Sequence, residues 1–69
     1  PIFYLSRPPQ PDTIYVTFGS QVIPNDPVKG WVYDPVRNAL VFGDDIDLLP
    51  EPTGTQVDVD FTAAAEYEE

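Results

Sequence analysis

Short runs of alternating apolar and polar residues recur along the chain and predict β-strands. In residues 55–61, Val57, Val59 and Phe61 alternate with Gln56, Asp58 and Asp60. Successive side chains of a strand point to opposite faces of a sheet, so the apolar side chains would share the buried face. Residues 14–18 follow the same rule, with Ile14, Val16 and Phe18 directed inward. Both segments are therefore expected to be half-buried strands.

The other strand segments are shorter and are separated by residues that favour turns. They are residues 2–5, 21–23, 31–33 and 39–42. Gly19 and Ser20 fit a compact hairpin turn that leads into residues 21–23. Pro35 and Asn38 fit the turn before residues 39–42, because proline presets φ and asparagine tolerates a positive φ. Asp34 or Asn38 would close this turn with side-chain hydrogen bonds to the backbone.

Nine prolines leave almost no window long enough for a helix. We therefore predict an all-β fold, either a small antiparallel β-sandwich or a partly open barrel, with five to six short strands. Residues 1–61 would form a single domain, and residues 62–69 an acidic C-terminal tail. The predicted core consists of the inward-facing apolar residues of these strands: Phe3, Leu5, Ile14, Val16, Phe18, Trp31, Tyr33, Leu40, Phe42, Val57, Val59 and Phe61.

The charge balance narrows the range of partners. The chain has 69 residues, of which 12 are acidic and 3 basic, and its net charge is −9. This charge repels phosphate backbones and anionic lipid surfaces, so we expect no nucleic acid and no membrane surface as a partner. No apolar run is long enough to insert across a bilayer. Solubility, calcium binding and a basic protein partner, reached by mimicry of nucleic acid, remain open explanations.

The small size of the chain favours a role inside a larger assembly. A core of this size is only marginally stable, so a neighbouring domain or subunit is an expected partner. The sequence begins at Pro1 instead of a methionine, and we interpret it as a piece of a longer protein. Residues 2–5 are isolated by Pro8 and Pro9, and self-association by an edge strand is expected there.

Asp44, Asp45 and Asp47 form the densest group of acids and are the candidate metal ligands. Carboxylate oxygens suit Ca²⁺, and Glu51 or backbone carbonyls would complete the coordination shell. The spacing differs from that of an EF-hand loop. The alternative is a solvated acidic loop without a bound ion. Calcium is the one cofactor that the sequence suggests.

The sequence offers little for catalysis. The absence of histidine and cysteine excludes a Ser-His triad and thiolate zinc sites. Asp58 and Asp60 share a strand face and are a candidate acid–base pair, although an exposed strand face has the same pattern. Pro1 and Ile2 resemble the start of the N-terminal-proline tautomerases, in which the prolyl amine acts as a base. Prolines occupy the stretch in which that family has a long helix, and we predict that the chain is not an enzyme.

One longer pattern resembles a known family. Residues 30–42 have the form G-W-x-Y-D-x-x-x-N-x-hydrophobic-x-F, and P-x-G at 52–54 and V-x-V-x-F at 57–61 follow. This order resembles the small β-rich module near the C-terminus of bacterial surface or secreted proteins that carry a von Willebrand factor type A domain. The resemblance implies an extracytoplasmic module beside a metal-dependent adhesion domain, with no catalytic residues of its own. The D-x-S-x-S metal motif of the adhesion domain does not occur here, and the acidic loop after Phe42 is longer than in the module.

These observations lead to one expected function and three alternatives. We expect a non-catalytic structural or interaction module of a larger bacterial protein that is secreted or displayed on the cell surface. The alternatives are a virion or phage-tail structural component, which uses a related strand pattern, a calcium-binding adhesion module, and an N-terminal-proline tautomerase.

Overall fold

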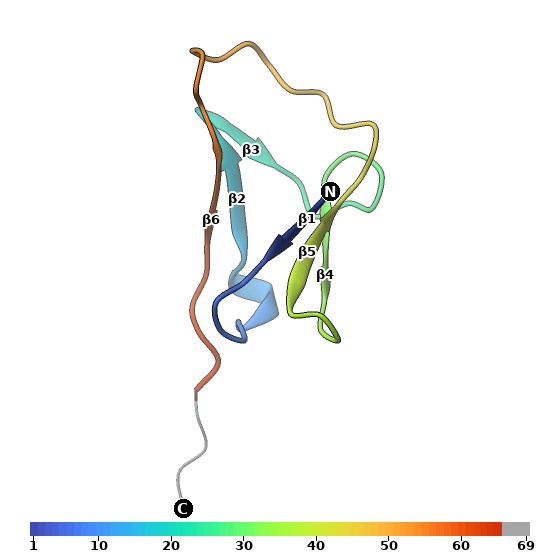
Figure 1. Ribbon diagram of the computed structural model, residues 1–69, viewed down its shortest axis with the longest axis vertical. Helices are drawn as coiled ribbons and strands as arrows, with labels where there is room; N and C mark the ends of the chain where they lie inside the picture. Colours follow the sequence, from blue (N-terminus) through green and yellow to red (C-terminus); the bar gives the residue numbers. More distant parts are fainter. Residues whose placement is uncertain (66–69) are drawn as a thin grey trace, which may run out of the picture.

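The computed structural model describes residues 1–65, which form six short strands in two antiparallel sheets (Figure 1). The order in the first sheet is β1 (Ile2–Tyr4), β5 (Ala39–Phe42) and β4 (Trp31–Asp34). The order in the second sheet is β3 (Gln21–Ile23), β2 (Tyr15–Phe18) and β6 (Val57–Asp60). One 3-10 turn, η1 (Pro11–Thr13), lies between β1 and β2. The predicted all-β fold is confirmed, and in residues 1–65 no helix has the length and apolar character needed to cross a membrane.

The hairpin between β2 and β3 turns on two residues, as the sequence predicts. Phe18 pairs with Gln21, which leaves Gly19 and Ser20 as the loop. Gly19 has a φ of 61°, and a glycine with positive φ at the first loop position is typical of a type II′ turn. A side chain at this position would collide with the carboxylate of Glu51, which lies against the turn.

The hairpin between β4 and β5 also follows the prediction. Asn38 adopts a φ of 51° at the end of the loop. The Asp34 Oδ1 atom accepts hydrogen bonds from the backbone N–H groups of Val36 (3.0 Å) and Arg37 (3.3 Å). The Tyr33 hydroxyl donates to Asn38 Oδ1 at 2.7 Å. Side chains on both sides of the loop therefore fix its conformation.

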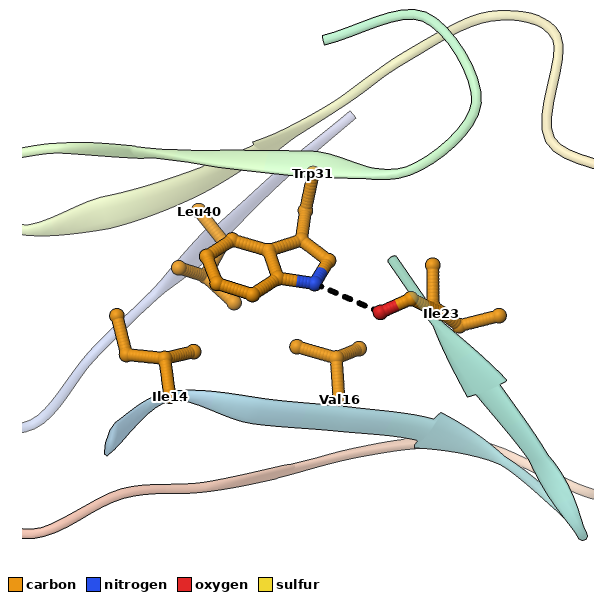
Figure 2. Close-up of a cluster of buried hydrophobic side chains, with 5 residues drawn as sticks. All are labelled: Ile14, Val16, Ile23, Trp31 and Leu40. Atoms are coloured by element: carbon orange, nitrogen blue, oxygen red, sulfur yellow. Dashed lines mark hydrogen bonds between the residues drawn. The ribbon is translucent and has the colours of Figure 1, made fainter. Parts of the chain in front are cut away.

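The hydrophobic core lies between the two sheets, as Figure 2 shows. Trp31 and Leu40 extend from the first sheet, and they meet Ile14, Val16 and Ile23 from the segments of the second sheet. Trp31 Nε1 donates a hydrogen bond of 2.9 Å to the backbone oxygen of Ile23. The indole ring thus fills the core and also links the sheets through its one polar atom.

Most of the predicted core is confirmed, and Phe3 is the exception. Ile14, Val16, Trp31 and Leu40 are buried, and the other predicted residues apart from Phe3 pack against them while half-buried: Leu5, Phe18, Tyr33, Phe42, Val57, Val59 and Phe61. Phe3 pairs with Leu40 but stays 38% exposed, because β1 is an edge strand with no neighbour beyond it. The assignment of Phe3 to the core is therefore wrong. Ile23 and Ala39 are buried, although they were not among the predicted core residues.

Two short bridges join the sheets at different places. After β3, Asn25 forms a parallel bridge with Trp31, whose N–H donates to the Pro24 oxygen at 3.0 Å. We call this the closed side of the molecule. After β1 and β6, Pro9 forms an antiparallel bridge with Ala63. The fold is therefore a sandwich that approaches a partly open barrel, with β1 and β6 unpaired along what we call the open side.

Backbone pairing extends past the boundary that the sequence predicts at residue 61. The Gln10 N–H donates to the Thr62 oxygen at 2.8 Å, and the Ala64 N–H donates to the Pro8 oxygen at 2.9 Å. The first residues of the expected tail are thus paired with the segment that follows β1. Residues 66–69 of that tail lie outside the described residues.

The pairings also fix the directions of the edge strands. β1 and β4 both run antiparallel to β5, so they are parallel to each other. β3 and β6 both run antiparallel to β2 and are likewise parallel to each other. The parallel bridge between Asn25 and Trp31 gives β3 and β4 the same direction. It follows that β1 and β6, which border the open side, run parallel.

Candidate functional site

The acidic loop, residues 43–56, carries the chain from the first sheet to the second. Ile46 and Gln21 are two of the residues that hold it in place. Ile46 packs against the core. The Gln21 side chain binds the loop backbone at two points, because its Nε2 donates to the Asp47 oxygen and its Oε1 accepts from the Leu49 N–H at 2.8 Å. The loop is therefore attached to β3 as well as to the strands that it joins.

Two of the three candidate calcium ligands, Asp45 and Asp47, lie around Lys29. Lys29 Nζ is 2.8 Å from Asp45 Oδ2 and 3.8 Å from Asp47 Oδ2. All three side chains are more than half exposed, so the ion pairs contribute little to stability. The structure therefore brings Asp45 and Asp47 together around an ammonium group, and Asp44 has no ion-pair partner among residues 1–65.

Glu51, the suggested additional ligand, is engaged elsewhere. Its Oε2 accepts hydrogen bonds from the backbone N–H of Ser20 (3.3 Å) and the Ser20 hydroxyl (3.2 Å). In the described part of the chain, no group of three or more acidic side chains is arranged to hold a metal ion. Calcium binding at Asp44, Asp45 and Asp47 stays a prediction, for which Lys29 is the local competitor.

A third carboxylate near Lys29, that of Asp26, has a structural role. The Asp26 Oδ1 atom accepts from the backbone N–H groups of Lys29 (2.7 Å) and Val28 (2.8 Å). These hydrogen bonds lower the pKa of the Asp26 carboxyl from its ordinary value, and the bond from the Lys29 N–H has the largest effect. The Gly30 N–H donates to the Asp26 backbone oxygen at 3.0 Å. Asp26 therefore fixes the tight loop that leads into β4.

Asp58 and Asp60 lie outward on β6, as the alternation predicts. Both are exposed, whereas Val57, which precedes Asp58, and Val59, which lies between the two aspartates, are half-buried. Their pairing partners on β2 are Thr17 and Tyr15. Neither aspartate lines the apolar pocket described next. The structure thus brings the two carboxylates to one face without enclosing them.

An apolar pocket opens under the acidic loop, at the end of the open side. It has a volume of about 320 Å³, and every side chain that lines it is apolar: Pro1, Ile2, Phe3, Ile23, Phe42, Ile46, Leu48 and Val57, with the backbone of Gly43. This volume lies at the lower end of the range for small-ligand sites. Such a lining supplies hydrophobic attraction and shape, but no side-chain hydrogen bond and no side-chain charge.

Pro1 borders this pocket, which bears on the tautomerase alternative. No side chain that lines the pocket has a polar atom that would orient a substrate beside the prolyl nitrogen. The segment after β1 holds the short turn η1 where a tautomerase has its long helix. The arrangement offers binding of an apolar group and no evident acid–base partner.

β1 forms the other exposed feature of this region. All three of its residues are exposed, with Ile2 at 40%, Phe3 at 38% and Tyr4 at 66%. Hydrogen bonds flank the strand on the side of β5: Phe42 N–H to the Pro1 oxygen (3.1 Å), and Leu5 N–H to the Asn38 oxygen (3.0 Å). Because antiparallel ladders alternate, the backbone groups of Ile2 and Tyr4 point away from β5. They form an open strand edge.

Sequence reasoning did not find the pocket, because its lining comes from five separate segments. One signal was present: Ile46 and Leu48 alternate with Asp45 and Asp47 in the acidic loop. This alternation indicated that one side of the loop would face an apolar surface. The sequence contained no signal that this surface would be left partly hollow.

Comparison of the chain with protein-family models, curated proteins and solved structures finds no match. The resemblance to the module of von Willebrand factor type A proteins is neither supported nor contradicted by them. The pocket and the β1 edge are therefore the features from which a function is inferred.

Proposed function

We propose that the chain is a non-catalytic interaction module of a larger extracytoplasmic protein, and that it binds a protein partner through its open side. The observation that carries this proposal is β1, whose three apolar residues are all exposed. Soluble proteins usually protect strand edges with charges, prolines or a covering segment. In a module with a net charge of −9, an uncharged edge of Ile2, Phe3 and Tyr4 is best explained by a partner that covers it.

The remaining chemistry agrees with binding. The pocket next to β1 has an apolar lining, and no acidic side chain of the described region is buried. Addition of a strand to an open edge is a common mode of peptide recognition, in which the backbone supplies affinity and side-chain pockets supply specificity. The extracytoplasmic location rests on the sequence resemblance alone.

A photo-crosslinking experiment in the full-length protein tests this function. A photoreactive residue replaces Tyr4 in one variant and Val22 in a matched control, because Val22 is a similarly exposed apolar residue on the edge strand β3. We expect a discrete crosslink to one polypeptide from Tyr4 and none from Val22, in intact cells that express the protein at its native level. Equal crosslinking at both positions, or none at Tyr4, would contradict the proposal. Digestion by a protease added to the intact cells tests the location.

A further inference from the structure

Along the open side, the space between β1 and β6 has the shape of a wedge. A backbone bridge closes the end of the wedge near Pro9, and the end near the pocket is open. At the closed end, Pro9 bridges Ala63 through the backbone. At the open end lies the apolar pocket, which is lined by Ile2 and Phe3 from β1 and by Val57 from β6 (Figure 1 shows the two strands). The two edges therefore diverge toward the pocket.

Both walls of the wedge are strand edges without a neighbour. The backbone groups of Ile2 and Tyr4 point away from β5, as the flanking hydrogen bonds show. β6 pairs with β2 on one side, and its other side has no partner strand in the described part of the chain. Because β1 and β6 run parallel, one extended segment can run antiparallel to both of them. Such a segment would continue the all-antiparallel pattern of the fold.

The pocket sets the chemistry of one residue in that segment. Its lining is apolar throughout, and Leu48 at its rim is 52% exposed. Burial of a large aliphatic or aromatic side chain there would remove apolar surface from water on both partners. A polar or charged side chain would lose its hydration without gaining a hydrogen-bond partner from the lining side chains.

The surroundings of the pocket set the chemistry of the flanking residues. Asp44, Asp45 and Asp47 lie on the loop whose Ile46 and Leu48 line the pocket. Asp58 and Asp60 lie exposed on β6, next to Val57. Lys29 is the one cation paired with these carboxylates in residues 1–65. The resulting field attracts basic residues and repels acidic ones.

We propose that the wedge binds an extended segment of a partner protein, antiparallel to β1 and β6, that places one large apolar side chain in the pocket and has Lys or Arg beside it. The inference rests on the proposed function and specifies the partner. It also gives the acidic loop a role. The alternating residues of the loop would present apolar side chains to the large apolar side chain of the partner, and carboxylates to the Lys or Arg beside it.

Synthetic peptides test the inference on the isotope-labelled 69-residue chain. The probe is a short peptide that alternates lysine with valine and has a central leucine. One control replaces every lysine by glutamate, and another carries N-methyl groups on all of its backbone nitrogens. We expect the lysine peptide to shift the NMR signals of Ile2, Tyr4 and Val57 and to leave Val22 unchanged. The glutamate and N-methylated peptides should bind at least about tenfold more weakly, because the first lacks the basic side chains and the second lacks the backbone N–H donors.

Two adjacent leucines provide a matched pair of variants. Leu48 lines the pocket and Leu49 does not, and they are 52% and 60% exposed, so either position tolerates a polar residue. Leu48→Asp should weaken binding of the lysine peptide by about tenfold or more, whereas Leu49→Asp should change it by less than about twofold. Equal effects of the two substitutions would overturn the assignment of the pocket.

Other outcomes contradict the inference in distinguishable ways. Signal changes at Val22 without changes at Ile2, Tyr4 and Val57 would place the peptide elsewhere, and tight binding of the N-methylated peptide would exclude strand addition. Sedimentation at increasing concentration tests whether a second copy of the chain occupies the wedge. A dimer that Leu48→Asp disrupts would show that the occupant is a second copy and not a basic partner. If crosslinks form at Tyr4 in the full-length protein and no lysine peptide binds, the interaction function stands and the inference about its partner fails.

Discussion

The closed and open sides of the molecule are bordered by strands of the same two sheets, yet different interactions hold them. On the closed side, the Trp31 N–H, the Trp31 indole N–H and the Asn25 amide donate to backbone oxygens between 2.9 and 3.0 Å away. On the open side, backbone bonds join the segments only beyond the strands, and apolar residues border the rest. The difference indicates that specific hydrogen bonds define the fold on one side, while the other side keeps unpaired surface available for binding.

The largest expected effect lies on the closed side. Trp31→Ala removes the ring from the core and the hydrogen bond to Ile23, and should lower the free energy of unfolding by about 3–5 kcal/mol. Trp31→Phe keeps most of the ring but leaves the buried Ile23 oxygen without its donor, at a cost of about 1–3 kcal/mol. Urea denaturation followed by circular dichroism measures both. Equal effects of the two variants would show that the hydrogen bond, and not the packing, dominates.

Truncation on the open side should cost less. Phe3→Ala removes a side chain that is already 38% exposed, and we expect a loss of about 1–2 kcal/mol in the free energy of unfolding. Thermal melts of Phe3→Ala and Trp31→Ala under the same conditions provide the comparison. A larger loss for Phe3→Ala would mean that the open side stabilises the fold more than its exposure implies.

The closed end of the wedge depends on a threonine. Thr13 Oγ1 donates to the Gln10 oxygen at 2.7 Å and accepts from the Thr62 N–H at 2.9 Å. Thr13→Val keeps the shape and removes these bonds together with the longer one from Oγ1 to the Thr62 oxygen (3.4 Å), and should cost about 1 kcal/mol. Hydrogen exchange at the amides of Gln10 and Thr62 should accelerate, while exchange at Trp31 on the closed side should stay as in the parent protein. Uniform acceleration would indicate global destabilisation instead of local opening.

The loop before β4 should make stability depend on pH in the acid range. The pKa of Asp26 is lower in the folded protein than in the unfolded chain. Ionised Asp26 therefore favours the folded state above the unfolded pKa of about 3.9, and this contribution is lost as the pH falls through the lower folded-state pKa. The difference in the free energy of unfolding between the unsubstituted chain and Asp26→Asn should thus shrink on acidification. Urea denaturation at neutral and acid pH checks this, with Asp58→Asn as an exposed control.

The smallest effect is expected at the ion pairs of the acidic loop. Lys29→Met should change the free energy of unfolding by less than about 1 kcal/mol, because the pairs are exposed. Since Lys29 already neutralises Asp45, we expect calcium to leave the melting temperature of the parent protein unchanged. A calcium-dependent rise that is lost on chelation and in Asp45→Asn would establish the metal site that the sequence suggests.

Local patterns predicted the strands well, because the evidence for each one lies within a few residues. Gly19 and Asn38 adopt the positive φ angles that their turns require, and Val57 and Val59 face inward as their alternation indicates. The exposure of Phe3 could not be read from the sequence, since it depends on the place of β1 at the edge of a sheet. The pocket was equally inaccessible, because long-range packing of short segments determines whether apolar residues fill a space or border it.

The pairing of Lys29 with Asp45 also provides an experimental handle. Lys29 is the single lysine of the sequence, and Trp31, the single tryptophan, follows two residues later. An amine-reactive probe therefore reaches the acidic loop at one side-chain position, and the indole fluorescence reports on the core between the two sheets. With a fluorescent amine-reactive probe, the emission of the probe would report on the loop over the pocket, and the emission of the indole would report on the closed side, when a candidate peptide is added.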